Sequence, residues 1–299
     1  MEDSLLVKVG LPIAIMIIMC GIGLTLTLTD FRRIRERPKP VVIGLVGHYV
    51  LLPLLGFTVA WAFSLPTEFA VGLVLVAACP SGSSSNALTF LARGNVALAV
   101  TLTVISALAT FLSVPLLVNL ALDVFGGEAR EIRLPVGETI KHLAFLVLLP
   151  VTIGMAVRRF APTFAQKIEP TVGKFALMLL LVIIAALVYV ERAMFADMLT
   201  KVGPAALTLG CAAIGLGFLL GRACGLVLRD AITVGMEVGV QNATLAIVIA
   251  LTLLQSPQVA LPAAIYGLLM YVPALATVVL GRRAVAQQEA QGIAVLSSP

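Results

Sequence analysis

The chain has 299 residues, of which 60% are hydrophobic and only 12% charged, and its mean hydropathy is +1.10. A soluble domain ordinarily has about 25% charged residues, and no soluble fold of this length could bury so much apolar surface. The composition therefore indicates an integral membrane protein that lies in a lipid bilayer, and the net charge of +5 is too small to suggest a nucleic-acid partner.

A helix that crosses a bilayer needs about 20 predominantly apolar residues. Runs of this kind recur along the chain, and short connectors with proline, glycine or charge join them. The polar segment 284–299 is expected to be a flexible tail without function. The sequence predicts nine spans, at residues 8–28, 40–62, 67–92, 95–122, 139–157, 172–190, 203–222, 231–254 and 258–280.

The Lys and Arg residues predict the orientation of these spans, because cytoplasmic connectors are enriched in them. With the N-terminus outside and the C-terminus in the cytoplasm, fourteen of the 20 basic residues fall on the inner side. The six that fall on the outer side are Lys8, Arg130, Arg133, Lys141, Arg192 and Lys201.

Two of the runs contain polar interruptions. The third is broken by the segment Pro80-Ser81-Gly82-Ser83-Ser84-Ser85-Asn86, and the eighth contains Glu237 followed by Gly239, Gln241 and Asn242. An ionisable residue within a span is costly, and by default it indicates a functional site. Interrupted segments in both halves of a chain are typical of secondary transporters with a site at mid-membrane.

The two interruptions are similar in sequence. Residues 84–89, SSNALT, and residues 240–245, VQNATL, both place an asparagine before alanine. These runs lie five spans apart, an odd number, so they cross the bilayer in opposite directions, as an inverted repeat requires. The predicted fold class is an all-α integral membrane protein, an inverted-repeat secondary transporter whose first four spans correspond to its last four.

Unwound backbone in a membrane helix is tolerated only where protein or a water-filled cavity surrounds it. Its carbonyls, together with hydroxyls and a carboxylate, are hard oxygen ligands that suit a hard cation such as Na⁺. The helices that begin near Asn86 and Asn242 present N-terminal amides, which favour an anion. One site can therefore bind a cation and an organic anion together.

Each feature also has a purely structural explanation. Glu237 can be a neutral, protonated side chain that forms hydrogen bonds in a helix interface, and its functional alternatives are to neutralise the charge of a bound cation or to exchange protons. The small residues at the breaks can allow close helix packing, and Asn86 and Asn242 can tie helices together. His48 lies inside the second run, where it can be an interhelical hydrogen-bonding group, and its functional alternative is a proton-coupling or site-lining role.

Two segments resemble the signature of the bile acid:sodium symporter family: residues 79–98, CPSGSSSNALTFLARGNVAL, and residues 237–242, EVGVQN. The spacing of these segments and the nine-span pattern also fit the family, so the resemblance extends over nearly the whole chain. The chain resembles a bacterial member.

The resemblance implies one transporter unit with two domains and with two broken helices that cross at the site. It implies sodium-coupled symport of an organic anion by alternating access, in a monomer of the inner (plasma) membrane. A panel domain would hold spans 8–28, 139–157 and 172–190. A core domain would hold the others: 40–62, 67–92, 95–122, 203–222, 231–254 and 258–280.

The resemblance also implies two sodium sites. The first ion would be held by Ser85, Asn86, Thr103 and Glu237. The second would be held by Glu237, Gln241 and the backbone carbonyls of Val238 and Val240.

Two positions depart from the family pattern. Ala99 stands where the bacterial pattern has a further hydroxyl, and His48 stands where a glutamine often completes the second site. A protonated histidine would repel Na⁺. The alternative expectation is therefore a proton-coupled or mixed-coupling transporter that uses His48 and Glu237.

The family carries bile acids in animals and smaller carboxylates, such as pantoate or keto acids, in bacteria and plastids. The carboxylate would bind at the helix ends near Ser83, Ser84 and Asn242. A channel would instead need a continuous polar stripe along several spans. An enzyme using Glu237 and His48 would need a nucleophile or metal cluster beside them, and the sequence offers neither, so no enzymatic activity is expected.

Overall fold

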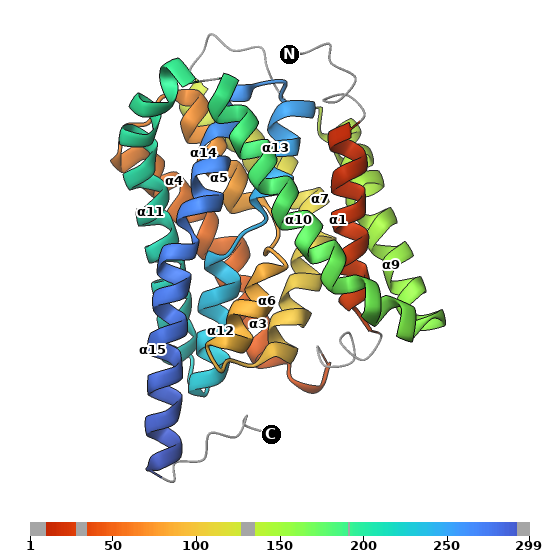
Figure 1. Cartoon of the computed structure of the whole chain (residues 1–299). Coiled ribbons are helices and arrows are strands. Elements are labelled where there is room, and N and C mark those ends of the chain that lie inside the picture. The colour runs from red at the N-terminus through yellow and green to blue at the C-terminus, as the bar shows by residue number, and fades with distance from the viewer. Residues whose placement is uncertain (1–9, 28–34, 127–134, 191, 292–299) are drawn as a thin grey trace.

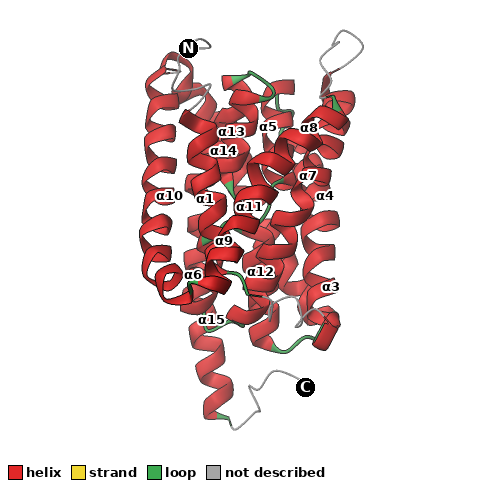
Figure 2. Ribbon diagram, turned by 90° about the vertical axis from the view of Figure 1, so that its right-hand side faces the viewer, coloured by secondary structure: helices red, strands yellow, loops and turns green. Residues whose placement is uncertain are grey.

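The computed structural model describes residues 10–27, 35–126, 135–190 and 192–291. Its named elements are helices, which short links join (Figure 2). The chain is therefore an all-helical, multi-pass membrane protein. Five helical segments are long and apolar enough to cross a membrane by themselves: Pro38–Ala62, Val96–Gly126, Val136–Phe160, Met198–Ala223 and Pro257–Ala290.

Within the described residues, the shorter apolar helices are Pro12–Thr25, Thr67–Ala78 and Ala243–Thr252. The last two are short because the chain leaves the helical conformation within the third and eighth expected spans. The helices of the first half are α1 (Leu11–Thr25), α3 (Pro38–Val46), α4 (Leu52–Ala62), α5 (Thr67–Ala78), α6 (Ser84–Leu91), α7 (Val96–Gly126) and α8 (Val136–Leu143). Those of the second half are α9 (Leu149–Phe160), α10 (Pro162–Val190), α11 (Arg192–Ala223), α12 (Leu228–Gly239), α13 (Ala243–Thr252), α14 (Pro257–Leu269) and α15 (Tyr271–Ala290).

Two wide turns of π-helix interrupt the helical segments, η2 (Gly47–Leu51) between α3 and α4 and η3 (Ala144–Leu148) between α8 and α9. Each is followed by a Leu-Pro pair, at Pro53 and at Pro150. Proline has no N–H and crowds the preceding turn, and a locally widened turn accommodates it. Such turns often lie at functional sites, and η2 contains His48.

The helices pack in two groups. Helices α1, α9 and α10 contact one another, whereas α4, α5, α7, α11, α12, α13 and α14 form a second set of contacts. Within the first group, α1 and α9 meet at Gly23 and Gly154. A Cβ atom on Gly23 would lie 2.2 Å from the Val151 carbonyl oxygen, and one on Gly154 would lie 2.2 Å from the Cys20 carbonyl oxygen. Only glycine permits this backbone approach.

The second group places the two interrupted segments beside each other. Figure 1 shows α5 and α13 in the upper half of the bundle and α6 and α12 in the lower half. The residues that join α5 to α6 are 79–83, which we call the first link, and those that join α12 to α13 are 240–242, which we call the second link. Both links therefore lie near the middle of the bundle.

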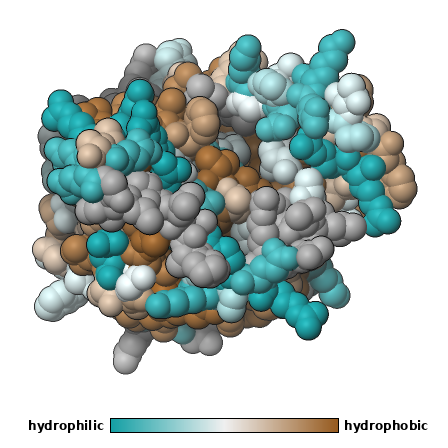
Figure 3. All heavy atoms as spheres, turned by 90° about the horizontal axis from the view of Figure 1, so that it is seen from below, coloured by the Kyte–Doolittle hydropathy of each residue, from teal (hydrophilic) through white to brown (hydrophobic). Residues whose placement is uncertain are grey.

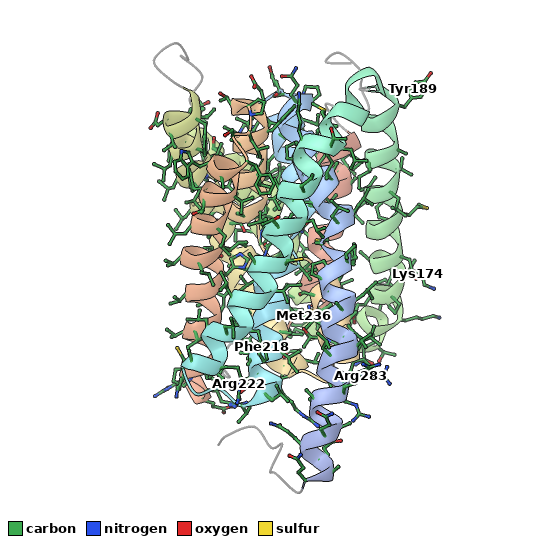
Figure 4. The ribbon with its side chains drawn as sticks, turned by 90° about the vertical axis from the view of Figure 1, so that its left-hand side faces the viewer. Lys174, Tyr189, Phe218, Arg222, Met236 and Arg283 are labelled. Atoms are coloured by element: carbon green, nitrogen blue, oxygen red, sulfur yellow. The ribbon has the colours of Figure 1, made fainter. Side chains whose placement is uncertain are left out.

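Basic residues gather at one end of the bundle. Figure 4 shows Arg222 and Arg283 toward the end where α15 projects, and Tyr189 at the opposite end. Seen from below, polar side chains surround an apolar hollow (Figure 3). Several residues that predicted the orientation lie outside the described residues: Lys8, Arg32, Arg33, Arg130 and Arg133.

The expected flexible tail begins inside a helix. Helix α15 continues to Ala290, and Glu289 on it pairs with Arg93 at 3.1 Å and with Arg229 at 2.9 Å. Because these partners adjoin α6 and α12, the helix end is tied to both interrupted segments. Residues 292–299 of the expected tail lie outside the described residues.

Candidate ion and substrate site

The first and second links run antiparallel and bond to each other. A bridge pairs Ser81 with Gln241. The Gly82 N–H donates to the Val240 carbonyl at 2.9 Å, and the Asn242 N–H donates to the Pro80 carbonyl at 2.9 Å. A short stretch of sheet-like pairing thus replaces the helical hydrogen bonds that both segments lack.

Gly82 allows the two links to approach this closely. An ideal Cβ atom at this position would lie 3.0 Å from the Gln241 carbonyl oxygen and 3.3 Å from its carbonyl carbon. The obstructing atoms are backbone, so a side chain here would force the links apart. The glycine in the predicted polar interruption therefore has a specific geometric role.

Hydroxyls of α7 satisfy other backbone groups that the first break frees. Ser113 Oγ donates to the Ala78 carbonyl at 2.9 Å, and the Ser81 N–H donates to Ser106 Oγ at 3.2 Å. In the second segment, the Tyr266 hydroxyl donates to the Gly239 carbonyl at 2.7 Å. Buried backbone groups must form hydrogen bonds, and these side chains provide partners where the helical hydrogen bonds are missing.

The sequence reasoning did not identify Ser106, Ser113 or Tyr266. The two serines continue a row of hydroxyls along one face of α7, in which Thr103, Ser106, Thr110 and Ser113 recur at helical spacing. That spacing was readable from the sequence and could have indicated the face of the span that meets the first link. No pattern in the sequence distinguishes Tyr266.

Glu237 lies where the two segments and α7 meet. It is 1% exposed, and its carboxylate accepts hydrogen bonds from Ser85 Oγ and, at 2.8 Å, from Thr103 Oγ1. Three separate helices, α6, α7 and α12, therefore hold one carboxylate. The structure thus brings together Ser85, Thr103 and Glu237, three of the four residues expected at the first ion site.

Asn86, the fourth expected residue, lies at the edge of this cluster. Its Oδ1 atom is 3.5 Å from Thr103 Oγ1, at the limit of a hydrogen bond. Ser81, which the sequence reasoning did not assign, donates from its Oγ to the Glu237 carbonyl at 2.8 Å. The first link therefore contacts the backbone of Glu237 through Ser81, and the start of α6, which follows this link, contacts its carboxylate through Ser85.

Another buried acid on α12 provides a contrast. Asp230 is fully buried, and it pairs with Arg37 at 2.9 Å and accepts from Asn95 Nδ2 at 2.8 Å. Glu237 forms no such ion pair with a described residue, and only hydroxyl groups donate to its carboxylate. Burying an uncompensated carboxylate is costly, so the environment of Glu237 favours an additional positive charge.

The residues expected at the second ion site lie on the second link and the end of α12. Gln241 Nε2 donates to the Val238 carbonyl at 2.8 Å and to the Glu237 carbonyl at 3.2 Å, and the Val240 carbonyl accepts from Gly82. The Gln241 Oε1 atom is buried, and no described residue donates a hydrogen bond to it. A bound cation is one group that could satisfy this oxygen.

His48 lies against the first link. Its Nε2 atom is 3.0 Å from the Cys79 carbonyl oxygen, and because a carbonyl only accepts, Nε2 carries the proton. The Nδ1 atom is buried, and no described residue forms a hydrogen bond with it. Next to it, an ideal Cβ atom on Gly47 would lie 2.8 Å from Val238 Cγ2, so η2 also lies against the end of α12. Ala99, the other position that departs from the family pattern, is fully buried.

A cavity of about 870 Å³ borders the two links. Its walls include the expected substrate residues Ser83, Ser84 and Asn242, together with Asn86 and Gln241. Its opposite side is formed by α1, α9 and α10. The cavity thus separates the two groups of helices and reaches the N-terminal ends of α6 and α13.

The polar groups at these helix ends are oriented by local contacts. Asn242 caps α13, since its Oδ1 accepts from the Leu245 N–H at 3.0 Å, which leaves the amide NH₂ as its free donor. The Tyr271 hydroxyl donates to Ser84 Oγ at 3.3 Å and also borders the cavity. From the sequence, Tyr271 fitted only an interfacial or packing role.

The sequence of this chain matches known membrane transporters. Residues 12–198 match the model of the Sodium Bile acid symporter family. The chain is 35% identical over 257 residues to the uncharacterized sodium-dependent transporter YocS of Bacillus subtilis, covering 84% of this chain and 76% of that protein. It is 32% identical over 251 residues to the probable chloroplastic sodium/metabolite cotransporter BASS2 of rice, covering 83% and 58%.

A human relative, the P3 protein, is 26% identical over 228 residues, which cover 76% of this chain and 47% of that protein. The chain thus spans about half to three quarters of the length of these relatives. The matched family model covers more than half of the chain, including the first link and most of the helices that surround it. The chain belongs to the sodium bile acid symporter family, a family of sodium-dependent membrane transporters.

Proposed function

We propose that this protein is a secondary active transporter that couples the uptake of an organic anion to sodium. The observation that carries the proposal is the buried Glu237 carboxylate, which receives only hydroxyl donors and lies where two interrupted helices meet beside a cavity. A monovalent cation bound there would offset the buried charge. The sodium-dependent relatives support Na⁺ as that cation.

The first ion would bind among oxygens of Ser85, Asn86, Thr103 and Glu237. The hydroxyls of Ser85 and Thr103 can turn their protons away and present lone pairs to the ion. The second ion would use Glu237, the free Oε1 of Gln241 and the carbonyls of Val238 and Val240. All these ligands are oxygens, the type that hard cations prefer.

The substrate would bind in the 870 Å³ cavity, with its carboxylate near Ser83, Ser84 and Asn242. The amides at the start of α6 and α13 and the NH₂ group of Asn242 are donors on that side. Bile acid-like molecules and small carboxylates such as pantoate or a keto acid are the candidate substrates, and the relative named as a metabolite cotransporter supports the latter class.

Transport would occur by alternating access between two domains of an inverted-repeat fold. The panel would consist of α1, of the span that runs from α8 through η3 to α9, and of α10, and the core of the helices around the two crossing links; the contacts among α1, α9 and α10 support this division. Rocking of one group against the other would open the cavity to each side in turn. The transporter would be a monomer in the plasma membrane, with its N-terminus outside and its C-terminus in the cytoplasm.

The unpartnered Nδ1 of His48 favours a second candidate, coupling partly to protons. A proton at this atom would place a positive charge against the end of α12, where the second sodium ion would bind. Sodium and proton would then compete, and sodium affinity would weaken as the pH falls.

Uptake into proteoliposomes tests the proposal. An inward Na⁺ gradient should drive radiolabelled pantoate or pyruvate above its external concentration, whereas a K⁺ gradient should not. A Glu237→Gln variant keeps the size of the side chain and should abolish accumulation. Equilibration without accumulation would indicate a channel, and chemical conversion of the solute would indicate an enzyme.

A further inference from the structure

The wall of the cavity that faces away from the two links contains a second group suited to an anion. On that wall α9 contributes Arg158, and α10 contributes Glu169 and Lys174. The opposite wall contains the helix ends and Asn242, which are assigned above to the substrate carboxylate. Donors for an acidic group therefore exist on both sides of one cavity.

Arg158 is the unusual member of this wall. Its Nη1 atom is buried, and no described residue accepts a hydrogen bond from it. A guanidinium is always charged and forms planar, two-point contacts with carboxylate or phosphate. Buried polar groups nearly always have a partner, and no described residue supplies one for this nitrogen. Because Arg158 also borders the cavity, the charge of its guanidinium is available to an acidic ligand there.

Neighbouring charges do not explain Arg158. Glu169 is half-buried at the same wall, yet it does not bond Nη1. Lys174 is exposed, and its side chain points away from the bundle in Figure 4. Arg159 is exposed as well and lies against the ring of Phe160, 5.8 Å from its centroid. Among these described cations, Arg158 is the one that borders the cavity and also has a buried nitrogen without a hydrogen-bond partner.

We infer that Arg158 binds a second acidic group of the substrate, which would be an organic dianion that bridges the cavity from the helix ends to α9. The inference rests on the proposed function, because it takes the first carboxylate to lie near Asn242. A volume of about 870 Å³ lies toward the upper end of the range for ligand sites, about 300–1,000 Å³. It leaves room for a molecule longer than a keto acid.

Binding of simple acids to the purified protein tests this inference. The probes are the potassium salts of straight-chain dicarboxylates from succinate to suberate, each compared with the monocarboxylate of equal chain length. Affinity would be measured from thermal stabilisation at a fixed, high Na⁺ concentration, for the wild type, Arg158→Gln and the control Arg159→Gln. Both variants remove one positive charge at adjacent positions.

At the chain length that fits, we expect the dicarboxylate to bind about 10- to 100-fold more tightly than the monocarboxylate, as a charge-assisted contact provides. Arg158→Gln should remove this preference while monocarboxylate binding and the Na⁺ response persist, and Arg159→Gln should retain it. No dianion preference in the wild type, or a preference that survives Arg158→Gln, would overturn the inference with the proposed function intact. A protein that responds to Na⁺ but binds neither series would also overturn the inference, and the uptake of pantoate or pyruvate then decides the anion-transport proposal separately.

Discussion

Replacing Thr103 by valine probes the environment of Glu237 with little change in side-chain shape. Thr103 is 1% exposed, and its hydroxyl donates a hydrogen bond to Glu237 Oε2 at 2.8 Å. A hydrogen bond to a charged group contributes about 1.5–3 kcal/mol, so Thr103→Val should lower the free energy of unfolding by about that amount in sodium-free buffer. The variant also removes one oxygen ligand from the proposed first ion site.

The loss of this ligand should weaken Na⁺ binding by about tenfold or more, because each factor of ten corresponds to about 1.4 kcal/mol. At saturating Na⁺ the sodium-induced stabilisation should therefore fall by about 1.4 kcal/mol. The assay is a thermal melt of purified protein across a NaCl titration, with KCl holding the ionic strength constant. The midpoint of the titration gives the apparent affinity.

Thr110→Val is the matched control. Thr110 lies on the same helix and is equally buried, but its hydroxyl donates only to the Ser106 carbonyl at 2.7 Å. Its replacement should cost about 0.5–1.5 kcal/mol of stability and leave the Na⁺ midpoint unchanged. The reasoning is refuted if Thr103→Val keeps the wild-type midpoint, or if both variants shift it equally.

Three further changes test other parts of the site. Glu237→Gln should preserve a folded protein in detergent but remove both the Na⁺-induced stabilisation and uptake, and normal uptake would show that the carboxylate is not a ligand. The glutamine in His48→Gln can keep the hydrogen bond to the Cys79 carbonyl and adds an oxygen. The change should therefore tighten Na⁺ binding and flatten the pH dependence of uptake between about pH 5.5 and 8. If wild-type uptake is already independent of pH and this change leaves it unaltered, protons do not compete with sodium. Gly82→Ala should reduce uptake several-fold, because its Cβ would press on the Gln241 backbone at 3.0 Å; unchanged uptake would mean that the links separate freely.

Much of the fold class was readable from the sequence because the bilayer restricts what a chain can do. Runs of about 20 apolar residues must be helices, so the all-helical membrane architecture followed from composition and run length alone. The positions where the helices stop were also visible, since Pro80 and the serines after it, and Gly239 with Gln241, are poor continuations of an apolar helix. The division into panel and core and the inverted repeat remain proposals.

The clustering of site residues was only partly predictable. Glu237 and Ser85 drew attention because they are polar within apolar runs, and the structure joins them by a hydrogen bond. Thr103 was expected at the site only through the family resemblance. A threonine in an apolar helix is common and does not by itself indicate a site. The roles of Ser106 and Tyr266 depend on which freed backbone group lies opposite each side chain, which is a matter of tertiary packing.

Arg158 is another residue whose proposed role could not be predicted from the sequence. In the sequence it is one of many basic residues that predict orientation, next to the similar Arg159. Its distinction arises from tertiary packing, which places the residue on the cavity wall, buries one of its nitrogens and leaves its neighbour Arg159 exposed. The positions of the basic residues served only to predict the orientation of the spans. The three-dimensional structure is needed to distinguish a candidate ligand-binding arginine from a surface one.

The most direct test of the central claim is the Na⁺ dependence of thermal stability in purified wild-type protein and in Glu237→Ala. A ligand that binds only the folded state stabilises it in proportion to its concentration over its dissociation constant. The account predicts a stabilisation specific to Na⁺, absent with K⁺ and lost in the variant. An equal response to K⁺, no response at all, or a response that persists in Glu237→Ala would contradict it.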